Sequence, residues 1–422
     1  MNNPSKRSIQ GTNHWPGAHS RRDVLRMGAA GGAFAMASGA RAMARPQTGG
    51  GRDTLVLVFL RGGADALSMV VPTQEAALYA ARPTLGVSAQ NTTSLDGFFG
   101  LNEVGARLLP WYLSGNLAFV HAVGSPNPTR SHFEAMRRLE QGAMTGGVLQ
   151  EGWLARHLRD TAPPTPTSSA RAIAIDRTLP TVMQGGPAAL PILTLAEFGL
   201  GGPPATRLAR AGRLETMMNA APLPDGPAGL TNLSTIEQLA PLDFGGRPLP
   251  PGVDYPPTKF GQSLYEAATL IKSGAPVEAI EVDSGGWDHH GFLGPLDGRF
   301  ALRLRELSWG LDGLMSDLGG DADRVTIVVM SEFGRRVDEN GSGGFDHGRG
   351  GVAMVLGGSH VNGGVVHSNW PGLEPADLDG KALAVTTDIR DVISEVLVKR
   401  MNTANLAVAL PNYTPSFLGL VN

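Results

Sequence analysis

The densest group of residues that could support chemistry in this 422-residue chain is the segment DSGGWDHHG, residues 283–291. Asp283, Asp288, His289 and His290 supply two carboxylates and two imidazoles directly after an apolar run, residues 277–282. Carboxylate and imidazole are common ligands of divalent metals, so a cluster of this composition is more often a metal site than a hydrogen-bonded polar loop. The segment therefore predicts metal binding, with the polar loop as the alternative.

A second polar group lies around two further apolar runs, residues 325–330 and 352–356. Glu332 follows the first run, and His347 lies in the loop that leads into the second. In open α/β sheets ligands bind beyond the carboxyl ends of the strands, so these two side chains could face one pocket. The alternative is that Glu332 pairs with Arg335 or Arg336 and that His347 only caps a turn.

Ser131 lies between an apolar run, residues 117–123, and an amphipathic helix expected over residues 132–141. Free backbone N–H groups at the start of a helix bind anions and lower the cost of an alkoxide, which suits a nucleophile. The alternative is a capping box in which Ser131 is the N-cap and Glu134 the third helical residue. Both roles can be combined in one serine.

Asp65 follows the first apolar run of the mature chain, residues 53–60, through the turn Arg61-Gly62-Gly63. It is either a metal ligand or the cap of the next helix, and capping is the commoner role of an aspartate at such a place. No complete G-x-G-x-x-G follows this run, which argues against a dinucleotide site.

Apolar runs of strand length alternate with amphipathic helices through most of the chain, which predicts an α/β fold with buried strands. Leucines repeat at three- and four-residue spacing over 304–318, which indicates a helix that packs on the sheet. Between residues 162 and 257 this pattern is replaced by turn-rich sequence with many glycines and prolines. We interpret 162–257 as an insertion or cap over the sheet.

The first 44 residues have the features of a twin-arginine signal peptide. Arg21 and Arg22 precede a short Gly/Ala-rich apolar segment, 27–40, which ends near two A-x-A cleavage motifs. Export would involve the twin-arginine translocon and would place the domain, residues 45–422, in the periplasm or otherwise outside the bacterial inner membrane. No later segment reaches the length of a membrane-spanning helix.

Composition limits the classes of site and partner. The chain contains no cysteine, so any metal must be held by carboxylate, imidazole, hydroxyl or water. Removal of residues 1–44 takes away six Lys/Arg and one Asp, so the net charge changes from -3 to -8. A chain with this acidic net charge lacks the excess of basic residues that is typical of nucleic-acid-binding proteins.

The motifs that carry these residues resemble the exported bacterial family known as domain of unknown function 1501 over almost the whole mature chain. They are VFLRGGAD, FVHAVGSPNPTRSHFEA, DSGGWDHHG, VVMSEFGRR, FDHGRGG and TTDIRDV. The order of the polar groups also resembles the alkaline phosphatase and sulfatase superfamily. This resemblance implies an alkaline-phosphatase-like three-layer sandwich with a mostly parallel central sheet and a Gly/Pro-rich insertion.

The resemblance also implies a metal half-site. Asp283, Asp288 and His290 match one half-site, which His347 completes. His289 stands where the family more often has a residue that is not a ligand.

A second half-site is implied by Asp65 and Glu332, with the Ser131 hydroxyl as the bridge. Phe333 stands where the superfamily has a ligating histidine, which puts the second metal in doubt. Pro126 occupies the position that would become formylglycine in a sulfatase, which argues against formylglycine chemistry.

Taken together, the sequence predicts a metal-dependent hydrolase of phosphate or sulfate esters. Zinc, manganese, iron and calcium are all candidates for the metal, Ser131 is the candidate nucleophile, and Arg61 or Arg130 could bind a small anionic ester substrate bidentately. The alternative is a metal-stabilised envelope protein that serves binding or assembly without catalysis. A serine hydrolase of the α/β type ranks third, because the chain has no G-x-S-x-G motif.

Overall fold

The computed structural model describes residues 53–422 except 145, 148, 163–170, 187–188, 196–197, 199–205, 221–229, 231–232, 237–238 and 240–245. All described residues belong to one compact unit, Gly50–Asn422. The twin-arginine motif and the cleavage sites lie outside the described residues.

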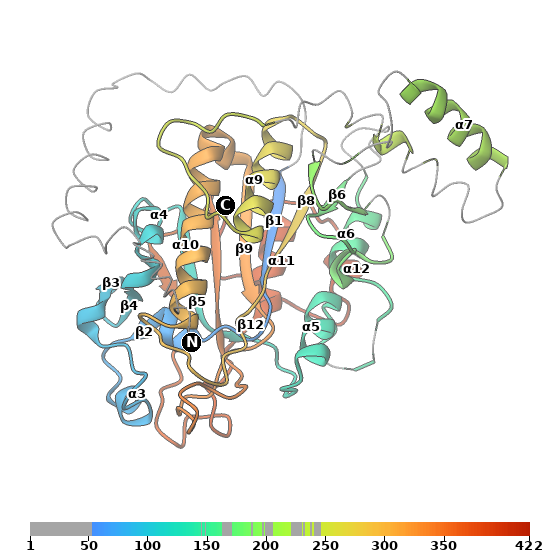
Figure 1. The fold of residues 1–422 in the computed structure, drawn as a ribbon. Helices are drawn as coiled ribbons and strands as arrows, with labels where there is room; N and C mark the ends of the chain where they lie inside the picture. The colour runs from blue at the N-terminus through green and yellow to red at the C-terminus, as the bar shows by residue number, and fades with distance from the viewer. Residues whose placement is uncertain are drawn as a thin grey trace, which may run out of the picture. The chain divides into compact units, whose positions relative to one another are not determined.

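Within the described residues, nine strands form a central sheet with helices around it (Figure 1). The strand order is β11 (Val365–His367), β5 (Leu117–Gly124), β10 (Gly351–Gly357), β9 (Val325–Ser331), β1 (Thr54–Leu60), β8 (Ala279–Ser284), β6 (Ala172–Ala174) and β7 (Ala189–Pro191), and β12 (Thr387–Asp388) pairs with β5. All pairings are parallel except those that β10 makes with β5 and β9. The predicted α/β fold with a mostly parallel central sheet is therefore confirmed.

Strand β1 shows why the strands are continuous apolar runs. Val56, Val58 and Leu60 point into one hydrophobic core, and the alternate residues Leu55, Leu57 and Phe59 point into another on the opposite face. Helices cover both faces, so side chains of both alternating sets are buried and must be apolar.

The longest helices pack on one face of the sheet. Helices α9 (Lys259–Lys272) and α10 (Arg299–Leu318) contribute to the same core as Val56, and both pass in front of the sheet in Figure 1. The predicted leucine stripe of α10 is buried along its whole length. On the other face lie α6 (Trp153–Asp160), α11 (Ile389–Lys399) and α12 (Leu406–Ala409).

Most of the other elements are short. Strands β2 (Val70–Pro72), β4 (Phe99–Asn102) and β3 (Thr92–Ser94) form a small antiparallel sheet. The further helices are α2 (Ala66–Met69), α3 (Ala76–Ala81), α4 (Leu109–Leu113), α5 (His132–Gln141) and α7 (Arg207–Ala220), and the 3-10 helices are η1 (Ala89–Asn91), η2 (Glu103–Leu108), η3 (Thr181–Met183) and η6 (Gly319–Arg324). No described helix combines the length and the apolar character needed to cross a bilayer.

Part of the segment interpreted as an insertion belongs to the sheet itself. Strands β6 and β7 both lie within 162–257, and β6 pairs in parallel with β8. The described part of this segment therefore extends the sheet beyond β8.

Candidate metal centre

The strand directions bring the predicted polar groups to one edge of the sheet. Strands β1, β8 and β9 are mutually parallel, and β5 runs the same way because antiparallel β10 lies between β5 and β9. The carboxyl ends of these four strands and the start of β10 therefore meet at one edge, where ligands bind in open α/β sheets.

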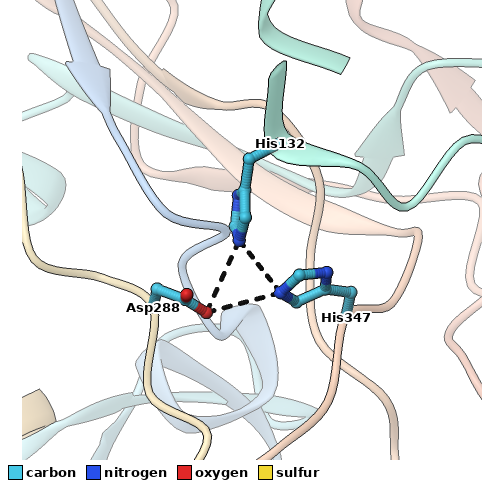
Figure 2. Close-up of side chains that lie close together, drawn as sticks. All are labelled: His132, Asp288 and His347. Atoms are coloured by element: carbon cyan, nitrogen blue, oxygen red, sulfur yellow. Dashed lines mark hydrogen bonds and ion pairs between the residues drawn. The ribbon is translucent and has the colours of Figure 1, made fainter. Parts of the chain in front are cut away.

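Three side chains from different strand ends form a triangle at this edge, as Figure 2 shows. His132 Nε2 lies 2.9 Å from His347 Nε2 and 3.5 Å from Asp288 Oδ1. The third side, from His347 Nε2 to Asp288 Oδ1, is 3.4 Å. His132 starts α5 after β5, Asp288 follows β8, and His347 precedes β10.

His290 adds a third imidazole to this group. Its Nε2 lies 2.8 Å from His347 Nε2 and 3.2 Å from Asp288 Oδ1. Its side chain is 47% exposed, against 19% for His132 and 23% for His347, so it forms the solvent side of the cluster.

Each imidazole has a hydrogen-bond acceptor beside its other nitrogen. The Arg130 carbonyl oxygen is 2.7 Å from His347 Nδ1, Glu332 Oε1 is 2.7 Å from His132 Nδ1, and Asp346 Oδ1 is 3.2 Å from His290 Nδ1. Because a carbonyl or carboxylate oxygen only accepts, these contacts favour the tautomer with the proton on Nδ1. The lone pair of each Nε2 then points toward the cluster.

This arrangement fits a bound cation. Facing nitrogen lone pairs repel one another unless a proton or a metal lies between them, and metal-bound histidines usually donate their other N–H to a carboxylate or carbonyl. Four tetrahedral ligands at about 2.0–2.1 Å from zinc lie about 3.3–3.4 Å apart. The contacts of Asp288 Oδ1 with the three imidazoles, 3.2 to 3.5 Å, match this spacing, and the two imidazole–imidazole contacts are shorter.

The charges are also suitable for metal binding. Burial raises the pKa of Asp288, but the hydrogen bond and charge of Arg335 outweigh it and hold this pKa below its ordinary value. Burial lowers the pKa of His347, whereas the hydrogen bond to Glu332 raises that of His132. Asp288 is thus an anion, and His347 is a neutral imidazole at neutral pH.

Glu332 lies behind His132 rather than among the converging ligand atoms. It is 2% exposed; its Oε1 accepts hydrogen bonds from the Gly62 amide at 2.9 Å and from His132, and its Oε2 accepts from the Ser331 hydroxyl at 3.0 Å. Burial raises the pKa of Glu332, but the hydrogen bonds from His132 and from backbone amides outweigh it and hold this pKa low. Glu332 therefore orients His132 in the structure.

Arg335 connects the candidate ligands to the turn after β1. Its guanidinium donates to Asp288 Oδ1 at 2.6 Å, to the Phe345 carbonyl at 3.0 Å, and to the carbonyls of Gly62 and Gly63. The side chain is 1% exposed, so this fork holds Asp288 in place from inside the protein. The arginine that the alternative interpretation paired with Glu332 thus contacts Asp288 instead.

The structure places Asp65 away from the cluster. Its two oxygens accept from the guanidinium of buried Arg82 at 2.7 and 2.9 Å, and its side chain does not cap α2. A carboxylate with both oxygens engaged by a buried arginine supports the fold, so we do not include Asp65 among the candidate ligands.

Ser131 is the N-cap residue of α5 and is exposed, but its hydroxyl forms no cap hydrogen bond. The expected capping box is absent from this helix start, because Glu134 pairs with Arg137 and Arg138 instead. The Arg130 guanidinium donates to the Asp379 carbonyl at 3.1 Å, while its own carbonyl orients His347.

Asp283 and Arg61 lie together in a different place from the His132–Asp288–His347 triangle. Arg61 Nε donates to Asp283 Oδ1 at 2.6 Å, and both side chains line a small cavity with Glu140 and Glu281. Asp283 is therefore not part of the converging group that contains Asp288 and His290.

His132 was not identified from the sequence as a candidate ligand. It lies one position after Ser131 in the same motif, and its role depends on a contact with Glu332, which is 200 positions away. The motif that contains Ser131 and His132 was recognised from the sequence. It does not indicate the strand order that brings the end of β5 near the end of β9. His289, which was left out of the ligand set, packs edge-on against Phe300 with ring centroids 6.3 Å apart.

Comparison with known proteins gives a family match over part of the chain and distant structural similarity. The model of the family described as "Protein of unknown function (DUF1501)" matches residues 244–402, which supports the family assignment drawn from the motifs. None of the curated proteins matches the chain. The matched range contains Asp288, His290 and His347 but not His132.

Among solved structures, the chain is similar to Ps i-CgsB. Its complex with k-i-k-neocarrahexaose has a TM-score of 0.36 and 10% identity over 85% of this chain and 74% of that chain. Ps i-CgsB also matches in another crystal structure with a TM-score of 0.33 and 10% identity over 84% and 77% of the two chains. Similarity at this level carries no argument about ligand or activity.

Proposed function

We propose that this protein is a metal-dependent hydrolase of phosphate or sulfate esters in the cell envelope, built on an alkaline-phosphatase-like fold. The observation that carries the proposal is the convergence of two Nε2 atoms, of His132 and His347, with Asp288 Oδ1, and the contact of His290 Nε2 with two of these atoms; each imidazole is fixed from behind by an acceptor. Such a group is costly to assemble without a cation, because its lone pairs and negative charge face one another.

The ligands of the proposed single metal are His132, Asp288, His290 and His347. A divalent cation held there would act as a Lewis acid on an ester oxygen and neutralise charge on the transferring group. A set of imidazoles with one carboxylate suits zinc, iron or manganese better than calcium, which prefers oxygen ligands alone.

A second metal beside the first is not part of the proposal. Glu332 is engaged by His132, Gly62 and Ser331, and Asp65 by Arg82. The Phe333 ring packs against the rings of His132 and His347, with centroids 4.8 and 5.1 Å away. An apolar ring thus covers the side of the cluster next to Glu332.

Two groups at the start of α5 are the proposed catalytic residues. Ser131 is exposed, precedes the candidate ligand His132, and lies where helix N–H groups favour negative charge. We assign it the role of nucleophile, and we assign the partly exposed Arg130 guanidinium the role of holding the anionic ester. Arg61 is less suited to that role, because three carboxylates surround it.

The second candidate function is a metal-stabilised envelope protein without catalysis. The observation that favours it is Phe333, which stands where the superfamily has a ligand to a second metal. The proposed site would therefore hold one cation rather than two.

The deciding experiment combines elemental analysis of the purified protein with turnover of aryl phosphates and aryl sulfates. Zinc, manganese, iron and calcium are supplied in turn. Bound metal with turnover that Ser131→Ala abolishes supports the hydrolase, with Ser114→Ala, at the exposed end of α4, as the control that keeps activity. Stoichiometric metal without turnover on any ester supports the non-catalytic protein, and absence of metal contradicts both.

Export belongs to the same proposal. The envelope location depends on Arg21 and Arg22, which precede the described residues, and on recognition by the twin-arginine translocon.

A further inference from the structure

A small polar cavity of about 220 Å³ lies at the carboxyl ends of β1 and β8. The residues that matter for its chemistry are Arg61, Glu140, Thr178, Thr181, Glu281 and Asp283. Its size suits a ligand of a few heavy atoms, since pockets for drug-sized molecules begin at about 300 Å³.

Carboxylates outnumber cations in this cavity. The Arg61 guanidinium contacts Asp283 Oδ1 at 2.6 Å, Glu140 Oε1 at 2.9 Å and Glu281 Oε1 at 3.5 Å. Asp176, at the rim, has its own partner in Lys259 at 3.2 Å. One guanidinium therefore faces three carboxyl groups, which leaves an excess of negative charge when all three are ionised.

Glu281 Oε1 has one cation near it, the Arg61 guanidinium at 3.5 Å, but accepts no hydrogen bond within the described part of the chain. The residue is 1% exposed, and its Oε1 accepts no hydrogen bond from any described residue, although the side chain lines the cavity. Burial, and then the neighbouring Asp283 carboxylate, raise the pKa of Glu281, as expected for an acid short of counter-charge. A buried carboxylate oxygen that accepts no hydrogen bond requires an explanation, and a bound donor would supply one.

The position of Arg61 decides which donor fits. Its guanidinium lies 3.9 Å from the centre of the Phe59 ring and is held by Glu140 and Asp283, so it stays in the cavity. A divalent ion would be strongly repelled by this fixed cation, and a neutral ligand would leave the excess charge unbalanced. A primary ammonium group carries a single charge and three donors, which suits carboxylate and hydroxyl acceptors.

We propose that this cavity binds the primary ammonium group of a small organic cation, with Glu281 and Asp283 as acceptors and with Thr178 and Thr181 in the lining. This site is separate from the candidate metal ligands and does not depend on the proposed hydrolase activity.

The test is calorimetric titration of the full-length protein with 2-aminoethanol, which is an ammonium ion at neutral pH, and with ethane-1,2-diol as its neutral counterpart. We expect saturable binding of the amine at one site and none of the diol. Since a charge-assisted hydrogen bond is lost, Glu281→Gln should weaken amine affinity at least about tenfold.

Control variants separate this site from other acidic surfaces and from the metal centre. Asp321→Asn, at an exposed carboxylate of η6, and His347→Ala should both leave amine affinity unchanged. If Glu281→Gln does not fold, Asp283→Asn, on the 32% exposed Asp283, takes its place. Equal affinity in the variants, saturable binding of magnesium or calcium that they abolish, or binding of the diol as tight as the amine would overturn the proposal.

Discussion

At the scale of single residues, the candidate metal centre depends on which nitrogen of each histidine carries a proton. Arg130, Glu332 and Asp346 supply acceptors to three Nδ1 atoms and so leave three Nε2 atoms free toward Asp288. These acceptors come from separate segments of the chain, which means that the tautomers are set by the fold and not by local sequence.

Replacement of His132 tests whether it is a ligand. Residues that only orient a ligand typically contribute about 10–100-fold to metal affinity, so removal of the ligand itself in His132→Ala should cost more than about 100-fold. Metal content by mass spectrometry after dialysis measures the effect. His367→Ala, which removes an imidazole in β11 outside the cluster, should retain metal. Equal metal content in the two variants would exclude His132 from the site.

The pKa shifts predict opposite pH responses with and without metal. In metal-free protein the Glu332 hydrogen bond raises the pKa of His132, so protonated His132 stabilises the fold below the ordinary histidine pKa of about 6.5. This stabilisation is lost as pH rises through the raised pKa. In metal-loaded protein, protons compete with the cation for Nε2, so stability should instead increase over the same pH range.

Melting temperatures between about pH 5 and 8, with and without a chelator, measure both trends. Glu332→Gln should weaken both, because it removes the carboxylate that raises the pKa of His132. Parallel pH curves for the two forms would contradict metal binding through this imidazole.

At the scale of elements, the two ends of the single loop between β9 and β10 must lie close together to place His347. The segment after β9 and the segment before β10 exchange backbone hydrogen bonds through Gly334, Gly348 and Arg349. A Cβ added at Gly334 would lie 1.9 Å from the Gly350 carbonyl oxygen, so this position has room only for glycine. This close approach puts His347 beside Arg335, which holds Asp288.

Gly334→Ala should therefore destabilise the protein and release metal together. Forcing backbone atoms apart costs about 3 kcal/mol or more of unfolding free energy. Gly341→Ala is the matched control, because its Cβ would meet nothing within 4 Å and its backbone is not left-handed. Denaturant unfolding and metal analysis of both variants measure the difference, and equal stability would show that the two ends of the loop separate without cost.

At the scale of the whole molecule, the proposed export route would link secretion to the candidate metal centre. A twin-arginine signal would carry a folded chain across the inner membrane, so the metal could be inserted beforehand. This sequence of events fits a centre whose ligands come from β5, β8 and β10 and meet only after the sheet has formed.

Changing Arg21 and Arg22 to lysine should block this route, because the translocon reads both guanidinium groups. Unprocessed protein should accumulate in the cytoplasm, which fractionation and immunoblotting would detect. An Arg7→Lys variant, outside the arginine pair, should be exported normally. Processed periplasmic protein from the double lysine variant would mean that another pathway exports the chain.

The class of fold and three of the four candidate ligands could be predicted from the sequence alone. Runs such as 325–330 are apolar throughout because both of their faces are covered, and this requirement is visible without a structure. Polar residues in the loops beside such runs lie at a sheet edge, which singled out Asp288, His290 and His347. The same reasoning also selected Asp65, Asp283 and Glu332, which the structure places outside the cluster.

Only the tertiary structure decided which polar groups meet. In the strand order, β10 lies between β5 and β9, and this arrangement brings His132 into contact with Glu332. Glu332, which was expected to be a metal ligand, therefore orients His132 instead. Asp65 pairs with Arg82, because a buried guanidinium requires an anion beside it. Asp283 pairs with Arg61. These contacts between side chains depend on which strands pair with one another. The local sequence around each residue does not indicate which strands will pair.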